Sequence, residues 1–260
     1  MADTHRSTTH VTYNTPYECF RCNRVATTIF GAQSPFLCAN GYCDAVIRHS
    51  ARTECWGFAI GSTLFAVGSA PGFAGWAGSA VTNSSFFVGS WFFTFAAFVQ
   101  LQLCGRLRGA WQPISGSQRT GRDVHVSEWL SAAVQLLGTV AFNISTGAAL
   151  TVLSIVDMDR YVWRPDVYGS IAFLISSGLA IFAVRLYRRR DEPDAPGWSA
   201  TILNTIGSIA FGFSAVGAYV DASGEPIKPL LDQGGTFIGA LCFLAASLIS
   251  LPRGTAPTSR

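Results

Sequence analysis

The chain has 260 residues, of which 49% are hydrophobic and only 13% are charged. Soluble domains carry about 25% charged residues, so this balance argues against a soluble protein and predicts an integral membrane protein. The net charge is +3 and follows a topological pattern described below, so it gives no reason to expect nucleic acid as a partner.

Residues 1–54 differ from the rest of the chain, because they are polar and hold four of its seven cysteines. These are Cys19, Cys22, Cys38 and Cys43. Two close pairs of thiolates are near the spacing of a small zinc site, so they are candidate metal ligands and zinc is the one cofactor to consider. Two alternatives stay open: residues 1–54 are a disordered cytoplasmic leader, or translation begins near Arg48 or Arg52. No signal peptide is expected, since a polar segment precedes the first apolar one.

Six windows without Asp, Glu, Lys or Arg follow, each close to the length that crosses a bilayer. They are 55–70, 84–104, 129–156, 167–184, 198–220 and 234–251. We therefore predict an all-α protein with a six-helix transmembrane domain at residues 55–251 and a cytoplasmic tail at 252–260. The first window is the shortest, and we expect it to be extended by a bend at Pro71.

The ends of these windows carry further features. Cys55 and Cys104 fall at the same end of two neighbouring predicted helices, and free thiols in a reducing compartment need no role. Ser127 is placed to cap a helix that begins near Trp129. His125 has no nearby carboxylate or cysteine in the sequence, so a surface position is expected.

The Lys and Arg residues alternate between the two sides of the predicted spans. Fifteen of the eighteen fall in the termini and in the second and fourth connections, and three in the others: Arg160, Arg164 and Lys228. Cationic residues collect on the cytoplasmic side, so both termini are predicted to be cytoplasmic, in a bacterial cytoplasmic membrane.

Each apolar window contains one copy of a nine-residue pattern: Gly, a small residue, two variable positions, Phe, two more variable positions and two small residues. The copies begin at Gly61, Gly89, Gly138, Gly169, Gly207 and Gly239. Repetition in every window predicts three repeated hairpins. In a helix the Gly, the Phe and a small residue share one face, so we expect helix packing in which a Phe fills the Gly notch of a neighbour. Packing is expected to be tighter in the outer half of the membrane than in the cytoplasmic half.

Polar side chains within the predicted spans are few. Gln135, Asn143 and Asn204 either bond to another helix, which is the favoured interpretation, or line a polar cavity. The segment Asp157–Asp166 is predicted to be an exposed outer loop, with Arg160 and Arg164 paired to its carboxylates and Pro165 opening the next helix.

Motifs of enzymatic chemistry are absent from the sequence, including the nucleophile elbow, the phosphate-binding loop, the dinucleotide fingerprint and the His-Glu-x-x-His helix. The six windows also contain no His or charged residue, which argues against ion coupling through carboxylates. We therefore expect no enzyme and no catalytic or cofactor-binding residue.

The phrases FFVGSWFFTFAAFVQ, VWRPDVYGSIAFLISS and GTFIGALCFLA carry a family resemblance. Over residues 55–251 the chain resembles uncharacterised actinobacterial multi-pass membrane proteins grouped with the YrhK-like family. The resemblance implies a fold and no activity, so it assigns no functional residue.

Two functions stay open at this stage. The first is a non-enzymatic membrane protein that packs against itself or another membrane protein within the lipid bilayer. The alternative is a small transporter or channel for a neutral or lipid-like solute, for which a cavity lined by Gln135, Asn143 and Asn204 would be required. An enzyme that uses the leader cysteines would require bound zinc or iron.

Overall fold

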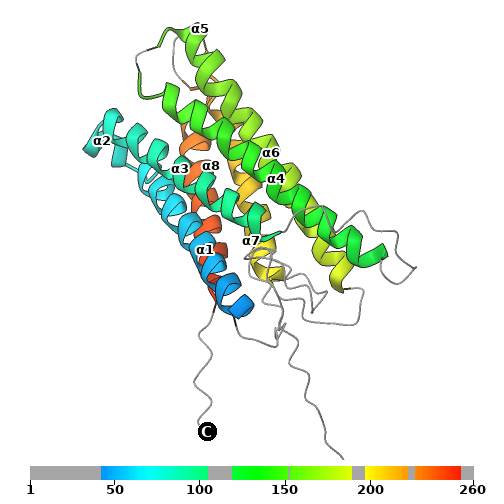
Figure 1. Ribbon diagram of the computed structural model, residues 1–260. Helices are drawn as coiled ribbons and strands as arrows, with labels where there is room; N and C mark the ends of the chain where they lie inside the picture. Colours follow the sequence, from blue (N-terminus) through cyan, green and yellow to red (C-terminus); the bar gives the residue numbers. More distant parts are fainter. Residues whose placement is uncertain (1–41, 105–118, 152, 189–196, 222–225, 253–260) are drawn as a thin grey trace, which may run out of the picture.

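The computed structural model describes residues 42–104, 119–151, 153–188, 197–221 and 226–252. Its elements are α1 (Tyr42–Gly68), α2 (Phe73–Ala77), α3 (Ser79–Leu103), α4 (Arg119–Ala148), α5 (Ile155–Asp157), the π-helix η3 (Met158–Trp163), α6 (Arg164–Arg188), α7 (Trp198–Gly217) and α8 (Pro229–Ile249). The described part of the chain is thus a bundle of long helices, as the apolar windows predicted (Figure 1).

The six long helices form a closed ring of contacts. The hairpin partners α1 and α3, α4 and α6, and α7 and α8 lie side by side, and each hairpin contacts the next through α3 with α4 and α6 with α7. The ring closes because α8 also lies against α1 (Figure 1). We call the end where α1 begins and α3 ends the inner end of the bundle, and the opposite end the outer end.

Five of the described helical segments are long and apolar enough to cross a membrane. They are Ser79–Leu103, Val126–Ala148, Ile155–Arg185, Trp198–Gly217 and Pro229–Ile249. The structure therefore supports a membrane-embedded protein. α1 is not among the five, because it ends at Gly68 and any 18-residue stretch of it includes Arg52 and Glu54.

Two helices begin earlier than predicted. α1 begins at Tyr42, inside the segment predicted as leader, and α4 begins at Arg119, so Ser127 lies within a helix and the predicted cap there is wrong. Hydropathy locates the apolar part of a helix, whereas polar turns that continue beyond it leave no apolar signal.

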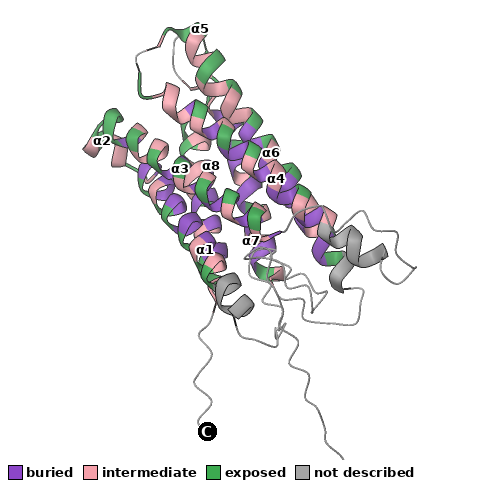
Figure 2. Ribbon diagram, viewed as in Figure 1, coloured by how far each residue is buried: buried purple, intermediate pink, exposed green. Residues whose placement is uncertain are grey.

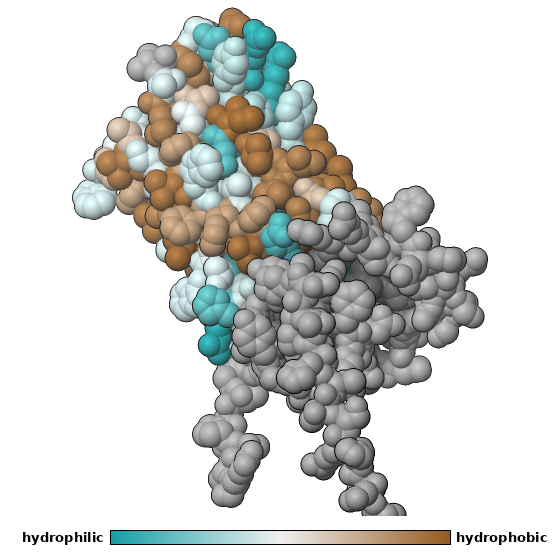
Figure 3. Space-filling view, viewed as in Figure 1, coloured by the Kyte–Doolittle hydropathy of each residue, from teal (hydrophilic) through white to brown (hydrophobic). Residues whose placement is uncertain are grey.

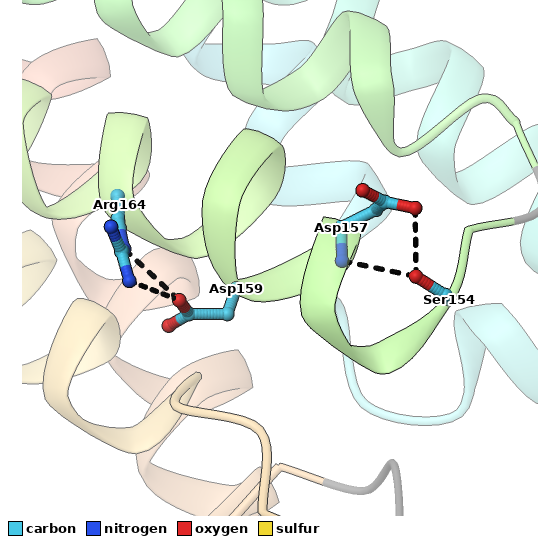
Figure 4. A network of polar contacts seen from close by, with 4 residues as sticks. All are labelled: Ser154, Asp157, Asp159 and Arg164. Atoms are coloured by element: carbon cyan, nitrogen blue, oxygen red, sulfur yellow. Dashed lines mark hydrogen bonds and ion pairs between the residues drawn. The ribbon is translucent and has the colours of Figure 1, made fainter.

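The predicted outer loop Asp157–Asp166 is also wrong, because this segment is helical through α5, η3 and the start of α6. The Ser154 hydroxyl accepts a hydrogen bond from the backbone N–H of Asp157 at 3.2 Å and donates one to its carboxylate at 2.7 Å (Figure 4). This cap starts the helix, and the pairing of Arg164 with Asp159 one turn later, at 2.7 Å, is one of the predicted local ion pairs. Pro165 follows the π-helix directly and lies inside this continuous helix, so the prediction that it opens the helix is wrong.

Burial follows the faces of the helices. Buried residues lie along the sides that meet other helices (Figure 2), while large apolar side chains such as Trp91, Phe98, Ile144 and Phe182 remain more than half exposed. Apolar residues cover much of the middle of the bundle on the face shown in Figure 3. A surface of this kind is compatible with lipid contact.

Candidate functional site

The repeated glycines lie where the two helices of each hairpin approach most closely. A Cβ built on Gly61 would lie 2.9 Å from the carbonyl oxygen of Gly89, and one on Gly207 would lie 3.0 Å from that of Gly239. A Cβ at 2.9 Å from backbone would force the helices apart, and one at 3.0 Å would be unusually tight, so glycine favours this approach.

The phenylalanine of each nine-residue copy packs on the glycine of its hairpin partner. A Cβ on Gly138 would lie 2.8 Å from the ring of Phe173, and one on Gly169 would lie 2.9 Å from the ring of Phe142. The contact is reciprocal because the helices are antiparallel and both side chains lean toward the N-terminus of their own helix. Phe211 likewise contacts the notch at Gly239.

The six phenylalanines meet in the interior of the ring and form what we call the phenylalanine cluster: Phe65, Phe93, Phe142, Phe173, Phe211 and Phe243. Each is at most 6% exposed. The cluster therefore fills the region between the three hairpins at the level of the glycine contacts.

Three members of the cluster, from α3, α6 and α8, all contact one another. The ring centroids are 6.4 Å apart for Phe93 and Phe173, 5.7 Å for Phe173 and Phe243, and 6.0 Å for Phe93 and Phe243. All three pairs are edge-to-face, which is a favourable arrangement for aromatic rings.

The other three members, from α1, α4 and α7, lie against this triangle. Phe211 contacts both Phe65 and Phe142 at 5.9 Å. Each of the three also contacts the phenylalanine of its own hairpin, at 5.2 to 5.4 Å. Rings from all three hairpins are thus in mutual contact, and the cluster joins the hairpins as well as the helices within each one.

The three polar residues singled out in the sequence each bond to a neighbouring helix. Gln135 accepts a hydrogen bond from Ser176 at 3.2 Å. Asn143 donates to the Thr94 hydroxyl at 2.8 Å. These are pairwise contacts between helices, which is the use that the sequence analysis favoured over a cavity.

Asn204 belongs to a similar contact between α6 and α7. Its amide donates to the Ser177 hydroxyl at 3.2 Å, and that hydroxyl lies 2.8 Å from the hydroxyl of Ser208. All three side chains are at most 3% exposed. At this point side-chain hydrogen bonds join the second and third hairpins.

Four buried acceptors or hydroxyls have no hydrogen-bond partner in the described part of the chain: Ser62 Oγ, Gln100 Oε1, Asn143 Oδ1 and Asn204 Oδ1. A buried polar atom of this kind is costly to leave unsatisfied. These atoms are therefore the places in the bundle where a bound water or proton donor would be most stabilising.

The inner end holds two buried carboxyl groups that the sequence analysis missed. Glu54 is 5% exposed and Glu128 is 4% exposed. Both lie one residue outside the apolar windows, so a search for charges within the windows excluded them. Glu54 lies outside the five membrane-crossing segments, and burial raises its pKa to about 8.

The predicted cysteine pair lies near these carboxyl groups in the sequence. Cys55 and Cys104 are both buried and are not in a disulfide, and the Cys104 thiol lies 3.9 Å from the backbone carbonyl of Glu128.

At the outer end of the bundle, Trp163 of η3 contacts the end of α7 and Tyr219. The Trp163 indole N–H donates to the carbonyl oxygen of Ala215 at 2.9 Å, and its ring meets that of Tyr219 at 4.8 Å. Arg160 lies 5.4 Å from the ring of Tyr161. The polar residues of this segment therefore make structural contacts within the protein.

The proposed zinc ligands Cys19, Cys22 and Cys38 lie outside the described residues, and only the backbone of Cys43, within α1, is described. His125 lies on the first part of α4, where side chains are not described. Among the described side chains no group of three or more His, Cys, Asp or Glu residues is arranged to hold a metal ion.

Comparisons with known proteins give no match: no protein-family model, no curated protein and no solved structure is similar to this chain. Function must therefore be argued from the geometry of the bundle.

Proposed function

We propose that the chain is a non-enzymatic, multi-pass membrane protein of the bacterial cytoplasmic membrane that acts by binding another membrane protein or a second copy of itself. In this proposal the apolar part of α1, from Cys55 onward, is a sixth span and both termini are cytoplasmic. The phenylalanine cluster carries the proposal, because its six buried rings occupy the interior where a transport path between the hairpins would have to run.

The distribution of polar groups favours the same function. A transporter for a neutral solute requires polar groups that face a common space. Here Gln135, Asn143 and Asn204 bond in pairs to hydroxyls of neighbouring helices. These pairwise bonds favour a packing role for the three residues over a shared polar path.

The outer surface offers large side chains for contact with lipid or protein. On α3, Trp91, Phe95 and Phe98 are 55%, 50% and 51% exposed and lie at the spacing of one helix face. Aromatic side chains are common in protein interfaces, although lipid accommodates the same residues.

In vivo photo-crosslinking tests this proposal. A photoreactive amino acid placed at Trp91, Phe98 or Phe182 in native membranes is expected to give a discrete protein adduct from at least one position, identified by mass spectrometry as a second copy or another membrane protein. The matched control is Trp76, which is 85% exposed on the short helix α2. Adducts with lipid alone at all three positions would contradict the proposal.

A further inference from the structure

The register of the α1–α3 hairpin brings Glu54 and Gln100 to facing positions. The register of this hairpin is given by its contacts: a Cβ on Gly57 would lie 2.9 Å from the Ala96 Cβ, and the rings of Phe58 and Phe93 are 5.8 Å apart. Glu54 is one turn from Gly57 toward the inner end.

Gln100 is one turn from Ala96 in the same direction, since the two helices are antiparallel. Both side chains lie on the buried stripes of their helices, and each is 5% exposed. The next pair of facing positions beyond Gly57 and Ala96 is therefore Glu54 and Gln100.

A Glu54 carboxylate and the Gln100 amide oxygen would be two hydrogen-bond acceptors without a donor between them. Gln100 Oε1 is buried without a donor. No ion pair or hydrogen bond to the Glu54 carboxyl group is found among the described residues. A carboxylate here would be buried beside an unsatisfied amide oxygen, whereas a protonated carboxyl group is itself the missing donor.

Among the described side chains, no cation lies on the buried side of the helices around Glu54. On α1, His49 and Arg52 are on the exposed side. Of the titratable residues whose side chains are described, those that are not exposed at this end are Cys55 on α1, Cys104 on α3, Glu128 on α4 and Cys242 on α8. None of these carries a positive charge, so the environment favours the neutral acid.

We infer that Glu54 and Gln100 form a proton-binding site at the inner end of the bundle, in which the Glu54 carboxyl group donates a hydrogen bond to Gln100 Oε1. Release of the proton to water leaves a carboxylate facing the amide oxygen and loosens this end of the α1–α3 hairpin. The site thus couples the packing of the first hairpin to pH. The raised pKa of Glu54, about 8, agrees with this geometry.

Infrared spectroscopy of the full chain in lipid nanodiscs, titrated from acid to alkaline pH, tests the inference. The expected result is a carboxylic-acid C=O band in the wild type that disappears with a midpoint near pH 8, is absent in Glu54→Gln and shifts in frequency and midpoint in Gln100→Leu. The control is Asp157→Asn, which removes a carboxylate that accepts a hydrogen bond from Ser154 at the outer end of the bundle. This variant is expected to leave the band unchanged.

Three results would overturn the inference. One is the absence of a band that depends on Glu54, and another is a midpoint near the ordinary value of 4.5. The third is a band that Gln100→Leu leaves unaltered. If Glu54→Gln does not fold, the wild-type titration and the Gln100→Leu shift decide the matter, because neither depends on that variant.

Discussion

Gly138 and Gly169 meet backbone to backbone, and a Cβ on either would lie 3.0 to 3.1 Å from the carbonyl oxygen of the other. The same geometry recurs in the other two hairpins, at Gly61 with Gly89 and Gly207 with Gly239. Lipid gives no hydrophobic drive for two apolar helices to associate, so these close approaches carry much of the packing energy.

Substitution of Gly138 by Ala is expected to destabilise the protein by about 1 to 3 kcal/mol, because the added methyl group overlaps the Phe173 ring and the backbone of α6. Gly138→Leu and Gly207→Leu are expected to abolish most of the folded yield in membranes. Unfolding in mixed micelles measures the first effect, and size-exclusion chromatography of solubilised membranes measures the second.

The matched control is Gly178 on α6, where an added Cβ would meet nothing within 4 Å. Gly178→Ala should be neutral or stabilising by up to about 1 kcal/mol, because alanine favours the helix. Equal losses from Gly138→Ala and Gly178→Ala would contradict the prediction, because the close contact at Gly138 would then not account for the effect.

Phe173 contacts four other members of the phenylalanine cluster, Phe93, Phe142, Phe211 and Phe243. Phe173→Ala is therefore expected to cost about 3 to 5 kcal/mol through the cavity it leaves. The exposed Phe98 on α3 gives a control with the same change of side chain, for which a loss below about 1 kcal/mol is expected. A small effect at Phe173, measured by the same unfolding assay, would mean that the cluster does not hold the hairpins together.

The hydroxyls of Ser177 and Ser208 are 2.8 Å apart and join α6 to α7. A double-mutant cycle with Ser177→Ala and Ser208→Ala is expected to give a coupling energy of about 0.6 kcal/mol, the usual size for hydrogen bonds between membrane helices. Pairing Ser177→Ala with Ser131→Ala, whose partner is Ser176, should give a smaller coupling. Additivity in the first cycle would rule out a stabilising bond between Ser177 and Ser208.

The stability of the protein is expected to fall as pH rises from about 4.5 to about 8. Folded Glu54 holds its proton up to about pH 8, whereas the unfolded chain releases it near 4.5, so over this interval the folded state binds one more proton. Glu54 contributes at most about 1.4 kcal/mol per pH unit to the slope of the unfolding free energy against pH. Thermal unfolding at several pH values measures it, and Glu54→Gln should flatten the profile; an identical slope in that variant would assign the effect to other groups.

Reporter fusions test whether α1 crosses the membrane as a sixth span. A fluorescent-protein fusion after Leu251 and a periplasmic phosphatase fusion after Asp221 should both be active if six helices cross and both termini are cytoplasmic. Fusions after Leu103 and Leu150 extend the test to the first two hairpins. Because α1 is less apolar than the other five long helices, phosphatase activity of a fusion after Ala77 is the result that bears on it directly. Inactivity there would leave five spans.

The apolar helices could be predicted from sequence because hydropathy reports directly on the parts that contact lipid. The helical start of α4 at Arg119 could not, since polar turns outside the apolar window look like a loop when only hydropathy is considered. The charges and Pro165 of the segment after Ser154 predict a loop, whereas the Ser154 cap and a π-helix make it helical. Periodicity does not reveal π-helices, which depart from a period of 3.6.

In the candidate site, the sequence likewise indicates the residue types but not their partners. The side-chain types of Gln135 and Asn204 pointed to interhelical bonding, but their partners Ser176 and Ser177 depend on how the hairpins are placed in three dimensions. Glu54 was missed because it lies one residue outside an apolar window, and its burial arises from the continuation of α1 and its contact with α3. Contacts between distant segments of this kind leave no local trace in the sequence.

The central claim is that the interior between the hairpins is closed. Stopped-flow light scattering on proteoliposomes measures it most directly, because osmotic shrinkage and re-swelling report permeation by water and by neutral solutes such as glycerol. The account predicts rates for the purified wild type that equal those of protein-free liposomes. Faster, protein-dependent permeation of either one would contradict it.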